Sequence, residues 1–222
     1  MSQRLSGWER RRADLYETPR WVGGVLLDHL EGEDLLAPAQ DVIYEPAAGP
    51  GRLVRLFAER GYQVSGRDLL AYSDAQPGGI DFTATLYPPL GTTAIITNPP
   101  YGHAGRTAEA FIRNALGMLA SDRCDVRLVA MLLRPDFDSG STRTDMFADC
   151  AHWGHRLVLL NRIYWVEPQP DENGRTSGPS ENHVWWIWTR DLVQRGTGYA
   201  AKPRDAVEIW QESASSKSVT PP

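Results

Sequence analysis

The sequence predicts an α/β fold with a mostly parallel sheet and helices on both faces. Apolar strand-like runs alternate with amphipathic helical segments over the first 135 residues, which is the pattern of βαβ units. An apolar run at 92–97 also ends directly on Asn98-Pro99-Pro100-Tyr101, and open α/β sheets bind ligands at the carboxyl ends of their strands. The last two predicted strands, joined by a long loop, are expected to pair as an antiparallel edge.

Each element is predicted from its apolar pattern and from the residues at its ends. Thr18 and Pro19 favour the start of a helix over 18–30, with Thr18 as the cap and Pro19 in the first turn. Gly61 favours the end of a helix over 51–60. The other expected elements are strands at 41–45, 63–68, 92–97, 126–133, 156–163 and 183–189, and helices at 106–120 and near 142–150.

Length and composition fit one domain. The chain has 222 residues, of which 41% are hydrophobic and 23% charged, as is typical of soluble globular proteins. We expect a polar lead-in over 1–15, one domain over 16–200 with a mobile loop at 167–182, and a flexible tail over 205–222. Because no apolar run could span a bilayer and no signal-peptide core is visible, we expect a cytoplasmic protein without a membrane partner.

The charge pattern neither requires nor excludes a nucleic-acid partner. The net charge is -5, although the distribution of cations matters more than their sum. Nearly every basic residue is Arg, which suits bidentate contacts with phosphate. Arg134, Arg143 and Arg162 follow or connect predicted strands and are candidates for clamping phosphates, with ordinary surface salt bridges as the alternative.

A cluster at Cys150, His152 and His155 has the residue types of a metal site. A structural zinc site supplies four ligands, and only Cys124 or a distant His could complete this one. We therefore expect no metal, and solvated or packed side chains at these positions.

Three segments have the features of a nucleotide-type cofactor site. The turn from Glu45 to Gly51 follows a strand and opens a helix, so its glycines and the helix N-terminus favour an anionic group such as an amino-acid carboxylate. Asp68 ends the second strand, where an acid can bind both ribose hydroxyls; the alternative is a cap for a helix that starts at Leu69. Asp81 could accept from an adenine amino group with Phe82 beside the ring, or it is a solvated loop acid.

The segment Asn98-Pro99-Pro100-Tyr101 is suited to binding an amino group. Two consecutive prolines forbid helix before them and stiffen the turn. The Asn98 carboxamide and the carbonyls of the turn then form a rigid cluster of acceptors. An exocyclic NH2 group offers two matching donors.

Together these motifs resemble those of the N6-adenine DNA methyltransferases, and the small phage-type members most closely. The matching segments are, in chain order, Tyr16-Glu17-Thr18-Pro19, Glu45 to Gly51, Asp68, Asp81-Phe82 and Asn98 to Tyr101. The resemblance covers 16–101, and the chain departs from larger relatives because no separate target-recognition domain is obvious.

The resemblance implies a Rossmann-like, S-adenosylmethionine-dependent methyltransferase fold with a seven-stranded sheet. Residues implied for binding S-adenosyl-L-methionine are Tyr16, Thr18, Pro19, Glu45, Pro46, Ala47, Gly49, Gly51, Asp68, Asp81, Phe82 and Asn98. Residues implied for catalysis are Asn98, Pro99, Pro100 and Tyr101. Candidates for substrate binding are Tyr101, Arg134 and Trp186.

The implied reaction is methylation of the N6 amino group of adenine in double-stranded DNA, with the base flipped into the site. Trp186 is the candidate for a second aromatic wall, and a packed core strand is the alternative. Rival targets for the same motif are RNA adenine, cytosine N4 and the amide of a protein glutamine. A rival of another class is a non-catalytic, methyltransferase-like subunit that binds DNA.

Overall fold

The computed structural model describes residues 16–72, 78–165, 168, 170–173, 175–176, 178–179, 181–191 and 196–206. The predicted lead-in at 1–15 and all but the first two residues of the predicted tail lie outside this set. The predicted mobile loop at 167–182 lies partly outside it.

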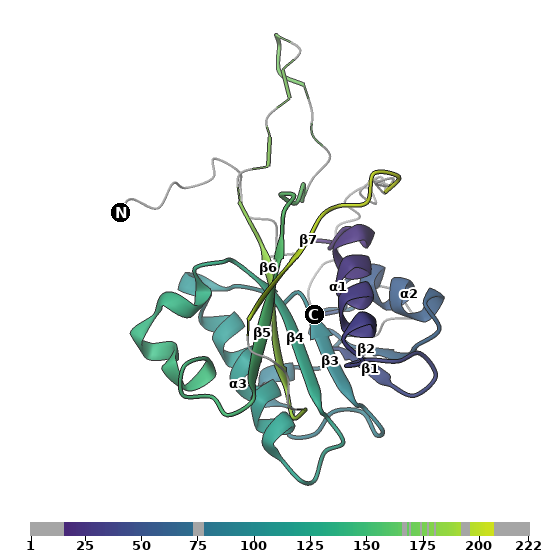
Figure 1. Cartoon of the computed structure of the whole chain (residues 1–222), viewed down its shortest axis with the longest axis vertical. Helices are drawn as coiled ribbons and strands as arrows, with labels where there is room; N and C mark the ends of the chain where they lie inside the picture. Colours follow the sequence, from purple (N-terminus) through teal and green to yellow (C-terminus); the bar gives the residue numbers. More distant parts are fainter. Residues whose placement is uncertain are drawn as a thin grey trace, which may run out of the picture.

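One seven-stranded sheet forms the centre of the molecule (Figure 1). Its strands are β1 (Val42–Glu45), β2 (Gln63–Gly66), β3 (Ala94–Thr97), β4 (Leu128–Leu133), β5 (Trp153–Leu159), β6 (Val184–Thr189) and β7 (Thr197–Ala200). They lie in the order β2-β1-β3-β4-β6-β5-β7. Strands β2, β1, β3 and β4 pair in parallel, whereas β6 is antiparallel to both β4 and β5.

Helices cover both faces of the sheet, as predicted (Figure 1). The helices are α1 (Arg20–Gly32), α2 (Arg52–Glu59) and α3 (Arg106–Ala120), with short 3-10 turns η2 (Phe82–Ala84), η3 (His103–Gly105), η4 (Phe137–Ser139) and η5 (Ser141–Met146). One buried cluster joins α1 and α2 to the sheet, and a second joins α3 and η5 to its other face. Because β3 and β4 are covered on both faces, all of their residues are buried.

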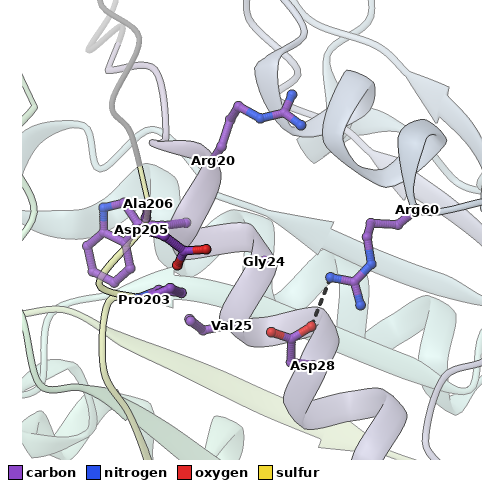
Figure 2. Close-up of a pocket in the computed structure, with 9 residues that line it drawn as sticks. Arg20, Gly24, Val25, Asp28, Arg60, Pro203, Asp205 and Ala206 are labelled. Atoms are coloured by element: carbon purple, nitrogen blue, oxygen red, sulfur yellow. Dashed lines mark hydrogen bonds and ion pairs between the residues drawn. The ribbon is translucent and has the colours of Figure 1, made fainter.

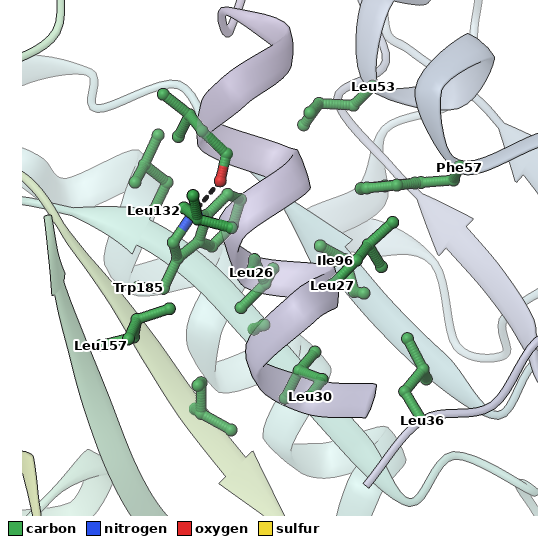
Figure 3. Packing of buried hydrophobic residues seen from close by; sticks show 14 of the residues in the cluster. Leu26, Leu27, Leu30, Leu36, Leu53, Phe57, Ile96, Leu132, Leu157 and Trp185 are labelled. Carbon is green, nitrogen blue, oxygen red and sulfur yellow. Dashed lines mark hydrogen bonds between the residues drawn. The ribbon is translucent and has the colours of Figure 1, made fainter. Parts of the chain in front are cut away.

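The packing of α1 determines where the segment before it lies. Leu26, Leu27 and Leu30 of α1 are fully buried and face Ile96 and Leu132 of the sheet (Figure 3). The Trp185 indole N–H of β6 also donates to the Val22 carbonyl in the first turn of α1 over 3.0 Å (Figure 3). This contact fixes the start of α1, and with it residues 16–19, against the sheet.

The tryptophans of β6 belong to the core. Trp185, Trp186 and Trp188 are all 0% exposed. Trp186 and Trp188 face the α3 side, where their indole N–H groups donate to the carbonyls of Arg134 (3.2 Å) and Met146 (2.6 Å). The expectation that Trp186 forms a second wall for a substrate is therefore wrong. Its ring is buried between the sheet and the α3 side, and its indole N–H is already bonded to the Arg134 carbonyl.

Two other local expectations need correction, and a third is confirmed in part. The segment near 142–150 is not an α-helix but contains η5, where the Arg143 side chain folds back on Phe137 and Glu109. Thr18 does not cap α1; Pro19 occupies the cap position and no side-chain cap bond forms. The predicted antiparallel pair of β5 and β6 is confirmed, but β7 lies outside it, parallel to β5.

Candidate active site

The predicted site residues lie at the carboxyl ends of three neighbouring parallel strands. Glu45 is the last residue of β1, Asp68 follows β2, and Asn98 follows β3. The register pairs Glu45 with Gly66 and Tyr44 with Ile95. Since the strands are adjacent and parallel, the three polar side chains share one edge of the sheet, which is where open α/β sheets bind ligands.

Asp68 joins the turn after β1 to the end of β2. One carboxylate oxygen accepts from the Gly49 N–H over 2.9 Å, and the other accepts from the Leu70 N–H over 3.0 Å. No helix begins at Leu69 in the described residues 69–72, so the helix-cap alternative for Asp68 is wrong. A carboxylate has further acceptor positions beside these two bonds, which leaves Asp68 able to accept from a ligand.

The turn that contains Pro46 and Ala47 leads into α2 in a conformation that depends on glycine. Gly49 and Gly51 have φ values of 52° and 88°, in the left-handed region that glycine adopts without strain. Gly51 is the N-cap of α2 and uses no side chain for capping. Helix α2 therefore begins just after the end of β1 with no side-chain cap on its first N–H groups.

Glu45 is a buried carboxylic acid with one free oxygen. The Ala47 N–H donates to Oε1 over 3.1 Å, whereas Oε2 has no partner among the described residues. Burial, with a smaller contribution from the nearby Asp68, raises the pKa of Glu45 to about 8. The Thr97 hydroxyl lies close enough to lower this pKa but makes no well-aligned hydrogen bond. Without a ligand, Glu45 is largely protonated at neutral pH.

Residues 16–19 connect the turn before α2 with the turn after β3. The Glu17 carboxylate pairs with Arg52, the first residue of α2, over 3.5 Å. On the other side, the Asn98 side-chain nitrogen lies 3.4 Å from the Tyr16 carbonyl oxygen. Thr18 and Pro19 are buried between these contacts and α1. The segment thus touches both the turn before α2 and the turn after β3.

The turn after β3 is held rigidly. Pro99 is buried, while Asn98, Pro100 and Tyr101 remain partly exposed. The Tyr101 ring packs on the α3 side of the core, and its hydroxyl is buried beside the Arg134 backbone without a well-aligned hydrogen bond. Burial raises the pKa of Tyr101 well above its ordinary value, so this phenol stays neutral.

Asp81 and Phe82 have more local roles than predicted. Asp81 caps η2, and its Oδ1 accepts from the Thr83 N–H and hydroxyl at 2.9 and 2.7 Å. Phe82 is 1% exposed and packs against the rings of Tyr44 and Phe111. Asp81 is exposed and can still accept from a ligand, whereas the Phe82 ring supports the core. Their contact with a cofactor stays a prediction.

The three candidate phosphate clamps already have partners within the protein, and for Arg134 and Arg143 these partners are acids. Arg134 pairs with Asp136 over 3.2 Å and Glu181 over 3.6 Å. Arg143 pairs with Glu109 over 2.7 Å, and Arg162 contacts Asn182 and the Pro179 carbonyl. Arg134 is exposed at the end of β4, so its role in substrate binding stays a prediction, but it would have to exchange partners.

Two aromatic residues at this edge were missed by sequence reasoning. Trp165 follows β5 and contacts the ring of Tyr16, with the centroids 5.9 Å apart. His183 precedes β6 and contacts Trp165, with the centroids 5.0 Å apart. Neither residue belongs to a local motif, and the contact of Trp165 with Tyr16 joins segments far apart in the sequence.

Other features of the described residues lie apart from this edge. No group of three or more His, Cys, Asp or Glu side chains among them could bind a metal, and no helix among them is long and apolar enough to cross a membrane. Instead, His155 turns its Nε2 toward His29 of α1, at 2.7 Å. A hollow of about 330 Å³ lies beside α1, where Asp28 pairs with Arg60 (Figure 2), but none of the predicted site residues lines it.

Comparisons with known proteins identify the fold. No protein-family model matches the chain, and no curated protein matches it. Among solved structures, a proposed RNA methyltransferase from Pyrococcus horikoshii superposes with a TM-score of 0.56 at 14% identity, over 85% of this chain and 94% of that one. The chain has a Rossmann-like methyltransferase fold.

Two further structures share this fold. The modification subunit of a proposed type I restriction enzyme from Vibrio vulnificus matches with a TM-score of 0.52 and 13% identity, over 87% of this chain and 49% of that one. This chain therefore spans about half of that subunit. A proposed hemolysin from Lactococcus lactis matches with a TM-score of 0.51 and 10% identity, over 83% of this chain and 94% of that one. The methyltransferase fold thus accommodates proteins described by different activities.

Proposed function

We propose that this protein transfers the methyl group of S-adenosyl-L-methionine to the exocyclic N6 amino group of adenine in DNA. The observation that carries the proposal is the position of Asn98-Pro99-Pro100-Tyr101. The segment follows β3 directly, beside the Glu45 turn of β1, and the Asp68 turn of β2 lies one strand further along the same edge. A group bound over the first two turns would lie next to the acceptors of the third.

The residues at this edge fit the chemistry of the cofactor. Glu45 has a buried, unpartnered oxygen, and the α-ammonium of a bound amino acid would supply both the missing donor and a compensating charge. Asp68 is the candidate for binding the ribose hydroxyls, and Asp81 is the candidate for binding the adenine amino group. When bound, S-adenosyl-L-methionine supplies an electrophilic methyl group on a positively charged sulfur.

The acceptors of the turn make the adenine amine nucleophilic. The lone pair of N6 is delocalised into the ring, so the free amine is a poor nucleophile. The Asn98 side-chain oxygen and the Pro99 carbonyl would accept its two hydrogens and stabilise the positive charge that develops on the nitrogen. Because the prolines fix these acceptors before the substrate arrives, the stabilisation is preorganised, and the fixed orientation of the amine lowers the barrier further.

Tyr101 is the candidate for holding the base. Its ring is partly exposed and packed on the core behind it, so it offers a rigid surface on which a flipped adenine can stack. An adenine inside a duplex must leave the stack to reach Asn98. Arg134 at the end of β4 is the candidate for contacting the adjoining phosphate after it leaves Asp136 or Glu181.

A methyl-transfer assay with several acceptors tests the proposal. Tritiated S-adenosyl-L-methionine is offered with double-stranded DNA, RNA and a glutamine-containing peptide, and the labelled product is hydrolysed and identified. We expect label in N6-methyladenine from DNA, and none with Asn98→Ala, which should still bind the cofactor by calorimetry. Gln40→Ala, an exposed carboxamide before β1 at the opposite edge of the sheet, is the matched control and should retain full activity.

The other outcomes separate the rival functions. Label in RNA or in the peptide would move the same chemistry to another amine. Absence of cofactor binding by the unmodified protein would favour a non-catalytic subunit. Full turnover by Asn98→Ala would remove the mechanism.

A further inference from the structure

A line of aromatic contacts ends at the side chain of Asn98. The Tyr16 and Trp165 rings meet edge to face with centroids 5.9 Å apart, and Trp165 meets His183 in the same way at 5.0 Å. The Tyr16 carbonyl oxygen then lies 3.4 Å from the Asn98 Nδ2. The line joins the ends of β5, β6 and β3 with the segment before α1.

The contact with Tyr16 decides which way the Asn98 carboxamide faces. A backbone carbonyl can only accept, so it favours the amide nitrogen as its neighbour. If the carboxamide were rotated by half a turn, two oxygens would face each other and the NH2 group would replace the oxygen toward the substrate. A donor at that position repels an amine that itself offers hydrogens. The proposed chemistry therefore needs the orientation that the Tyr16 carbonyl enforces.

Tyr16 needs support from outside its own segment. It lies before α1 in no helix or strand and is partly exposed. Trp165, in contrast, is packed against the apolar cluster under α1. Behind Trp165, His183 is 3% exposed, and burial lowers the pKa of its imidazole to about 4. A neutral, buried ring thus supports Trp165, and Trp165 supports Tyr16.

We propose that Trp165 is a positioning residue for methyl transfer. Its ring holds Tyr16 in place, and the Tyr16 carbonyl in turn keeps the Asn98 oxygen turned toward the incoming amine. The catalytic part of this inference rests on the proposed function, whereas the effect on Asn98 does not. Trp165 acts through Asn98 without itself touching the reacting atoms.

Substitution of Trp165 tests the inference through kinetics. Trp165→Leu keeps apolar packing but removes the ring; we expect kcat to fall on the order of tenfold or more, since small misplacements of reacting groups are costly, with cofactor affinity unchanged. Trp165→Phe should restore most of kcat. Tyr199→Ala, which truncates an exposed aromatic side chain on β7, is the control and should retain wild-type kcat. A rise in the KM for DNA at unchanged kcat would instead make Trp165 a substrate contact and overturn the inference.

Nuclear magnetic resonance gives a readout that needs no substrate. The side-chain amide signals of Asn98 are observed in protein labelled with ¹⁵N-asparagine and assigned by their absence in Asn98→Ser. We expect Trp165→Leu to shift these signals toward those of solvent-exposed amides, and Tyr16→Leu to do the same. Unchanged Asn98 signals in Trp165→Leu would overturn the inference. If the signals shift while no adenine is methylated, the positioning stands and only the proposed function fails.

Discussion

Glu45→Gln should stabilise the protein in alkaline solution. The folded protein holds the pKa of Glu45 at about 8, above the ordinary 4.5, mainly because the carboxyl is buried. Between these two values the unfolded chain has lost the proton while the folded chain retains it, so stability falls as pH rises. Gln has the same shape and can still accept from the Ala47 N–H, but it never ionises. The variant should therefore lack this pH-dependent loss.

The size of this loss of stability follows from the shift in the pKa of Glu45. A pKa difference of one unit corresponds to about 1.4 kcal/mol, so the rise from 4.5 to about 8 limits the loss to at most about 5 kcal/mol. At about pH 5 most of this loss has not occurred. We thus expect nearly equal free energies of unfolding for wild type and Glu45→Gln near that pH, and a more stable variant above about pH 8.

Urea denaturation without cofactor at the two pH values measures this difference. Other groups titrate in both proteins, so only the change in the difference between them reports on Glu45. Glu59→Gln, an exposed acid at the end of α2, is the control and should not gain stability at alkaline pH. A Glu45→Gln variant that is less stable than wild type above pH 8 would refute the assignment of Glu45 as a buried, largely protonated acid.

Three further predictions test other parts of the structure. Asp68→Ala should weaken S-adenosyl-L-methionine binding about tenfold to a hundredfold, as expected for lost hydrogen bonds to a charged group; unchanged affinity in calorimetry would restrict Asp68 to holding the Gly49 turn. Trp186→Ala should lower the free energy of unfolding by about 3–5 kcal/mol in urea denaturation. A much smaller decrease would contradict the core role of Trp186 and favour a contact with substrate. Burial is the main cause that lowers the pKa values of His29 and His155, and Glu33 opposes it. Stability should therefore fall as pH drops below about 6.5. His29→Gln should weaken this pH dependence of stability, and an unaltered pH profile would contradict the contact between His29 and His155.

Elements with a strong local pattern were predictable from the sequence. The helix expected at 106–120 is α3 at Arg106–Ala120, because one apolar face persists over its whole length. The turns around Gly51 and Asn98 were also predictable, since glycine and proline restrict the backbone locally. The order of the site motifs along the chain then placed Glu45, Asp68 and Asn98 at one edge of a parallel sheet.

Features that depend on tertiary contacts were not predictable. The segment near 142–150 forms short turns because Arg143 reaches back to Glu109 and to the Phe137 carbonyl, which no helix propensity describes. The edge strand β7 has only four residues and no distinctive pattern. Alternation along β6 predicts two faces, but not that the Trp186 face packs on the core. The contacts of Trp165 and His29 join segments more than a hundred residues apart.

A crystal structure with sinefungin tests the central claim most directly. Sinefungin carries an amine in place of the transferable methyl group, so its nitrogen marks the position from which the methyl leaves. The account predicts this amine within hydrogen-bond reach of the Asn98 side-chain oxygen, about 2.6–3.2 Å away, with Glu45 on the α-ammonium and Asp68 on the ribose. An Asn98 carboxamide that faces away from the amine, with the α-ammonium far from Glu45, would contradict it.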